Sequence, residues 1–108
     1  MAAVRFESSN VQDWKSFHEY CMEVFGFPDF YGKNMDAWID CMSSLDEEGM
    51  TRFLIKPDEM LQIEITETEA FRTRLREIFD AFVDCSAFVN QRYINSGRAP
   101  ALSLVFVN

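Results

Sequence analysis

The stretch Phe27–Cys41, which reads FPDFYGKNMDAWIDC, is the most informative part of this chain. Pro28 fixes its own backbone φ and disfavours a helical conformation at Phe27, so a preceding helix is expected to end here. Gly32 permits a turn with positive φ. Asn34 suits the N-cap of a new helix, because its side chain can accept from a free first-turn amide. The stretch therefore predicts a loop that leads into a capped helix.

The helix after Asn34 is expected to have two unlike faces. Its apolar residues recur at i, i+3, i+4 and i+7, the spacing of one helical face: Met35, Trp38, Ile39 and Met42. Asp36 and Asp40 are four residues apart and lie opposite that stripe. Such a pair can be a solvated polar face, or it can be an anionic binding surface that the preceding loop helps to shape.

At these residues the sequence resembles the barstar family, the intracellular protein inhibitors of secreted microbial ribonucleases. The residues in step with the family's signature are Pro28, Tyr31, Gly32, Asn34, Asp36, Ala37, Asp40 and Cys41. The resemblance implies a single domain over residues 1–108, with an α/β fold in which helices pack a small, mainly parallel β-sheet. It also implies an inhibitor rather than an enzyme.

In that family, the loop and helix carry an acidic surface that plugs a ribonuclease active site. Carried over residue by residue, the partner-binding candidates are Phe30, Tyr31, Gly32, Asn34, Asp36 and Asp40. Three features depart from the family's pattern: Phe30 replaces a Tyr, Lys33 stands where an acid can occur, and Trp38-Ile39 moves the large aromatic residue by one position. These departures bear on which target is bound.

The composition favours a basic protein partner over nucleic acid. The formal net charge of the 108 residues is −8, whereas nucleic-acid binding needs cations to replace phosphate counterions. No apolar run approaches the length of a membrane span, and the N-terminal residues do not resemble a signal peptide. We therefore expect a cytoplasmic protein that binds neither membrane nor nucleic acid.

No constellation for catalysis or metal binding can be recognised. The three cysteines, Cys21, Cys41 and Cys85, contain no CxxC pair and are expected to be reduced and buried in helices. The carboxylate pairs Asp36/Asp40 and Asp80/Asp84 could in principle hold a divalent cation. No phosphate-binding loop or nucleophile–base pair accompanies them, so we expect no cofactor and no metal.

The remainder of the chain predicts alternating strands and helices. Val4 and Phe6 alternate with charged residues in a short strand. Asn10 is expected to cap the next helix, with Asp13 in its first turn, and Gly26 is expected to end it. His18, the only histidine, is interpreted as a boundary residue of that helix.

The second half of the chain predicts two strands and one long helix. Residues 53–66 are expected to form a hairpin or an added edge strand with one wet face, although a barstar would more often continue into a short helix. A capping box at Thr66–Glu69 is expected to open a long helix that ends near Gly97. The nearly all-apolar run 102–107 is typical of a central strand covered on both faces.

Two hypotheses on function follow. The first is a barstar-like inhibitor of a ribonuclease, which blocks the active site with the acidic loop and helix. The second keeps the fold but directs it at a different toxin or at a cytosolic partner, a possibility that Phe30, Lys33 and the position of Trp38 favour.

Overall fold

Three short strands form one parallel sheet, on which the helices pack. The computed structural model describes residues 2–108. The strands are β1 (Ala2–Phe6), β2 (Leu61–Ile65) and β3 (Leu102–Phe106). They lie in the order β1-β2-β3, and both pairings are parallel. The predicted α/β class with a small, mainly parallel sheet is confirmed.

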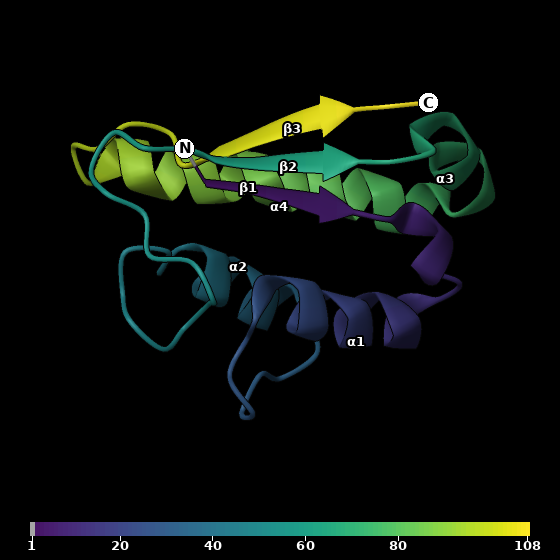
Figure 1. The fold of residues 1–108 in the computed structure, drawn as a ribbon, viewed down its shortest axis with the longest axis horizontal. Helices are drawn as coiled ribbons and strands as arrows, with labels where there is room; N and C mark the ends of the chain where they lie inside the picture. The colour runs from purple at the N-terminus through teal and green to yellow at the C-terminus, as the bar shows by residue number, and fades with distance from the viewer. Residues whose placement is uncertain (1) are drawn as a thin grey trace.

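The helices cover one face of this sheet. Within residues 2–108 they are η1 (Ser8–Asn10, a 3-10 turn), α1 (Trp14–Phe25), α2 (Met35–Met42), α3 (Thr68–Arg74) and α4 (Arg76–Asn95). In Figure 1, α4 runs along behind the strands, and α1 and α2 lie together on the β1 side. On the open face of the sheet, Arg5 and Glu64 form an ion pair of 3.3 Å. None of the helices in residues 2–108 is long and apolar enough to cross a membrane.

Aromatic side chains join the sheet to the helices. The fully buried ring of Phe6 on β1 lies edge-on to Phe82 of α4, with 4.9 Å between the ring centroids. Trp38 of α2 is also fully buried, and it lies edge-on to Phe82 at 5.7 Å and to Phe25 of α1 at 6.3 Å. Aromatic pairs prefer such tilted contacts. Helix α2 is therefore fixed to the core through Trp38.

The predicted places of the second and third strands are wrong. No hairpin forms over residues 53–66, because residues 53–57 form no strand and β2 is the central strand of the sheet. Strand β3 is an edge strand, and Phe106 at its end is 52% exposed. At the start of β3, the Asn90 side chain of α4 satisfies both backbone groups of Leu102: it accepts from the amide and donates to the carbonyl. An apolar run indicates that a segment can form a strand of a sheet, but it does not indicate where in the strand order that strand lies.

The first long helix begins later than predicted. Asn10 ends η1, and Asp13 is the N-cap residue of α1. The Asp13 carboxylate accepts from the Ser16 amide at 2.8 Å, while the Ser16 hydroxyl accepts from the Asp13 amide at 3.0 Å. This reciprocal capping box satisfies two free amides, which explains why the helix begins there. Gly26 ends α1 with φ of 70°, as predicted.

The predicted long helix is two helices. Glu67 adopts a left-handed conformation with φ of 47° and makes no side-chain cap, so the expected capping box is absent. Thr68 is instead bonded to both neighbouring strand ends: its amide donates to the Val107 carbonyl and its hydroxyl to the Ile65 carbonyl. The helical path is interrupted at Leu75, where φ is −135° and ψ is 59°.

Candidate functional site

The loop between α1 and α2 is held by hydrogen bonds near both of its ends. The Tyr31 amide donates to the Pro28 carbonyl at 2.9 Å, which closes a turn just after α1. At the other end, the Asn34 side chain accepts from the Ala37 amide at 2.8 Å, so the predicted N-cap is present. These two hydrogen bonds fix the conformation of the loop part of the candidate surface.

The positive φ expected at Gly32 occurs one residue later. Lys33 has φ of 55°, whereas Gly32 is not among the residues with positive φ. A Cβ atom placed on Gly32 would make ordinary contacts of 3.5 Å with Ala37 and Asn34. Neither a left-handed conformation nor a lack of space for a Cβ atom therefore requires glycine at position 32.

Tyr31 lies inside the molecule and supports the loop. Its side chain is only 5% exposed, and its hydroxyl lies 2.6 Å from Nδ1 of His18. Burial raises the pKa of Tyr31 and lowers the pKa of His18. Both groups are thus kept neutral, and the Tyr31 hydroxyl can donate to His18 in its Nε2-protonated tautomer. A direct contact of Tyr31 with a partner stays a prediction.

His18 supports the loop structurally, a role that the sequence did not reveal. It was interpreted as a boundary residue of its helix, yet it is buried against Trp14, Phe17 and Tyr31. The only signal in the sequence was a histidine beside the apolar stripe of α1. Its partner is 13 residues away, across a loop whose path the sequence did not fix.

Phe30 has the opposite environment from its neighbour. Its side chain is 75% exposed, the highest value among the large exposed apolar side chains of residues 2–108. A free aromatic ring beside a buried tyrosine gives the loop an apolar contact point. Aromatic residues are enriched among the anchors of protein interfaces.

Helix α2 divides as predicted into a buried and an exposed face. Trp38 and Met42 are fully buried, whereas Asp36 and Asp40 are exposed. Asp36 lies in the first turn of the helix, where the unpaired amides and the helix dipole favour a negative charge. The two carboxylates therefore face solvent from a helix that the core fixes in place.

The two carboxylates are not equivalent, because only one has a cation beside it. Nη1 of Arg92 on α4 lies 2.9 Å from Oδ1 of Asp40. The same guanidinium lies 3.5 Å from the Ser43 hydroxyl and 5.3 Å from the ring centroid of Phe88. Asp36 has no ion pair within residues 2–108. The sequence could not indicate the pair, since its members are 52 residues apart.

Helix α4 adds a further carboxylate to this surface. Burial raises the pKa of the Cys85 thiol, and the negative charges of Asp84 and Asp36 raise it further. Asp84 of α4 and Asp36 of α2 are thus both close enough to Cys85 for their charges to act on it. Asp80, the expected partner of Asp84, is paired with Arg76 at 3.1 Å instead. Within residues 2–108, no group of three His, Cys, Asp or Glu side chains is arranged to hold a metal ion.

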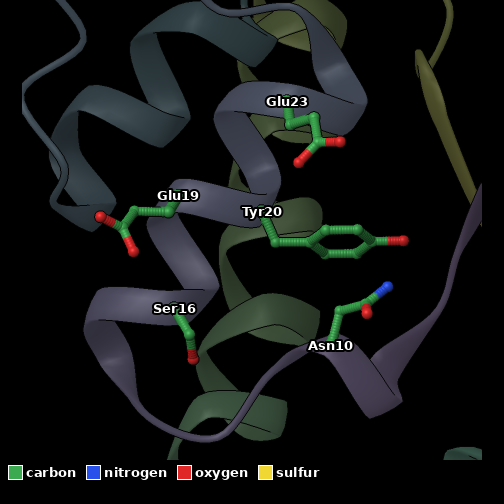
Figure 2. Close-up of a pocket in the computed structure, with 5 residues that line it drawn as sticks. All are labelled: Asn10, Ser16, Glu19, Tyr20 and Glu23. Atoms are coloured by element: carbon green, nitrogen blue, oxygen red, sulfur yellow. The ribbon is translucent and has the colours of Figure 1, made fainter.

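A separate hollow lies between η1 and α1. It is lined by Asn10, Ser16, Glu19, Tyr20 and Glu23. Figure 2 shows Tyr20 between Glu23 and Asn10, while Glu19 points away from them. The Tyr20 hydroxyl accepts from the Glu7 amide at 2.9 Å, and Ser16 belongs to the helix cap. Tyr20 and Ser16 thus already have structural partners, and we do not assign the candidate site to this hollow.

The comparison with protein families agrees with this arrangement. A family model described as Barstar (barnase inhibitor) matches residues 1–105 of the 108-residue chain. The chain therefore belongs to the barstar family, whose members are ribonuclease inhibitors rather than enzymes. A comparison with curated proteins finds no match.

Proposed function

We propose that this chain inhibits a barnase-like ribonuclease by placing the loop 30–34 and helix α2 over the enzyme's active site. The observation that carries the proposal is Asp36, which is exposed, has no ion pair within residues 2–108, and stands in the first turn of a fixed helix. An RNA-binding groove is lined by cations that meet phosphates. A carboxylate held rigidly on α2 can take the place of one phosphate charge.

The remaining residues of the surface have distinct roles in this proposal. Asp40 adds a second carboxylate one turn further along α2, and Phe30 covers apolar surface at the rim of the groove. Asn34 and Gly32 set the path of the loop, and Tyr31 anchors it from inside through His18. A surface that is already ordered in the free protein binds without a large loss of conformational entropy.

The charge of the whole chain supports a basic target. A net charge of −8 raises the rate at which a positively charged enzyme is encountered. We propose a secreted microbial ribonuclease as the target and the cytoplasm as the place where the inhibitor protects its own cell. The three free cysteines are compatible with a reducing compartment.

Titration against a basic microbial ribonuclease tests the proposal. RNA cleavage is followed at increasing concentration of the chain, and the dissociation constant is measured at low and at high salt. Exposed charges are screened over about 10 Å at 0.1 M salt, so affinity should fall steeply as salt rises. Absence of inhibition refutes the proposal, and tight binding that salt does not change places the interface on another surface.

A second function has specific support. The Arg92 cation on Asp40 and the exposed ring of Phe30 also suit an immunity or interaction domain directed at a different toxin or cytosolic protein. A gene for a secreted nuclease beside the gene for this chain would favour the inhibitor. A pull-down from the secreted proteins of the source cell, followed by a ribonuclease assay of what is captured, separates the two functions directly.

A further inference from the structure

The ion pair between Arg92 and Asp40 contributes little to holding the fold. Its side chains are 46% and 67% exposed, and solvent weakens the attraction between charges at that exposure. Buried groups join α2 and α4 instead. Trp38 packs on Phe82, and the Tyr93 hydroxyl donates to the Met42 carbonyl and accepts from the Leu45 amide. The pair therefore acts chiefly on the charge of the surface.

Arg92 is nevertheless held in a defined position. Three groups surround its guanidinium: the carboxylate of Asp40, the hydroxyl of Ser43 and the half-exposed ring of Phe88. A guanidinium over an aromatic face is attracted by the ring as well as by the carboxylate. The candidate surface thus presents a fixed cation among its acids.

This cation changes which partner the surface fits. A ribonuclease that places an arginine or lysine against Asp40 must displace Arg92 or bring its own cation close to it. Like charges brought together at an interface reduce affinity and exclude wrong partners. Neither Asp36 nor Asp84 forms an ion pair within residues 2–108, so Asp40 is the one of these three carboxylates that a cation already neutralises.

We propose that Arg92 is a specificity-determining residue of this surface. It neutralises Asp40 and selects a ribonuclease whose cations lie opposite Asp36 and Asp84 and which presents an acidic side chain opposite Arg92. This inference rests on the proposed inhibition of a ribonuclease. It assigns to the target a mixed-charge surface, in place of a uniformly basic one.

The test measures inhibition of barnase by the wild-type chain and by three variants. Arg92→Ala should increase affinity at least about tenfold, because Asp40 becomes free to meet the enzyme's cations. The double variant Arg92→Ala/Asp40→Ala should lose this gain, since no carboxylate is left to be freed. Arg76→Ala is the matched control. It removes the same charge from the same helix and breaks the exposed pair with Asp80, yet it should change affinity less than about threefold.

Each outcome supports or overturns the role assigned to Arg92. Tighter inhibition that is confined to Arg92→Ala supports the assignment. Equal inhibition by the wild type and Arg92→Ala overturns the role of Arg92 but leaves the inhibitor function standing. If none of the four proteins inhibits barnase, both are overturned, because removing Arg92 did not open the surface to a basic ribonuclease. Thermal unfolding of each variant checks that the fold is retained.

Discussion

Trp38 and Asp36 are two residues apart in helix α2, yet they lie in opposite environments. The indole of Trp38 is fully buried between helices α1 and α4, whereas the carboxylate of Asp36 faces solvent. The inner face of the helix packs against the core, and the outer face is exposed to a binding partner. A helix of eight residues gains little stability alone. Its outer face is rigid because its inner face is buried.

The largest effect is expected on the inner face. Trp38→Ala should lower the free energy of unfolding by about 3–5 kcal/mol, because it leaves a large cavity at the junction of three helices. Urea denaturation followed by circular dichroism measures this loss. A loss below about 1 kcal/mol would mean that α2 is not fixed through Trp38.

Trp38→Phe serves as the comparison for that measurement. The buried Nε1–H of Trp38 makes no full hydrogen bond within residues 2–108, and its contact with the Cys21 thiol involves only a weak acceptor. Phenylalanine removes this unpaired donor and keeps an aromatic ring. We therefore expect Trp38→Phe to be clearly more stable than Trp38→Ala.

On the outer face, the effect should move from stability to binding. Asp36→Ala should leave the melting temperature nearly unchanged and weaken inhibition of the target by about 2–5 kcal/mol, a range that includes charge pairs of the barnase–barstar complex. Asp40→Ala should weaken inhibition less, because Arg92 already neutralises that carboxylate. Enzyme titration and calorimetry on the same samples give both quantities.

A double variant sets the limit of this comparison. If Asp36→Ala/Asp40→Ala still inhibits fully, the outer face of α2 is not the binding surface, and the membership of the family concerns the fold alone. A lower melting temperature together with weaker binding would instead show that the carboxylates are structural.

The two faces of α2 could be predicted from the sequence because they depend on local spacing. The opposed positions of Asp36 and Trp38 follow from 3.6 residues per turn. The N-cap at Asn34 follows from the ability of an Asn side chain to accept from a free amide of the first turn. The loop was less predictable. Its positive φ occurs at Lys33 and not at Gly32, since a glycine permits that conformation without requiring it.

What the sequence did not reveal depends on contacts between distant segments. The Arg92–Asp40 pair and the His18–Tyr31 hydrogen bond join residues whose helices meet only in the folded chain. The strand order has the same cause. β2 alternates like an edge strand but is central, because β1 and β3 both pair with it, whereas the more apolar β3 lies at the edge.

A smaller effect is expected where the inner face supports the loop. Tyr31→Phe removes the hydroxyl 2.6 Å from Nδ1 of His18 and leaves this buried nitrogen without that partner. The loss of stability should be about 1–3 kcal/mol, the usual cost of an unsatisfied buried polar group. Binding should weaken only if the loss of the hydroxyl disorders the loop. Hydrogen exchange of the amides of residues 30–34 can detect such disorder. Unchanged stability would show that the hydroxyl has no structural role.

The smallest effect concerns the proton on His18, and it tests whether the loop support depends on pH. Burial lowers the pKa of His18 in the folded chain. The unfolded chain therefore binds more protons below its pKa of about 6.5, and stability should decrease as pH falls through that value. The decrease should be small, because a protonated Nδ1 can still donate to the Tyr31 oxygen and the ring stacks on Trp14 at 5.7 Å. Asp13, whose pKa is lowered by hydrogen bonds from Ser16, loses its contribution to stability only below about pH 4, so it does not overlap this window.

Urea unfolding at pH 7 and about pH 5 should show the decrease in the wild type and in Tyr31→Phe, which keeps the histidine, but not in His18→Gln. A decrease of equal size in His18→Gln would assign it to another group.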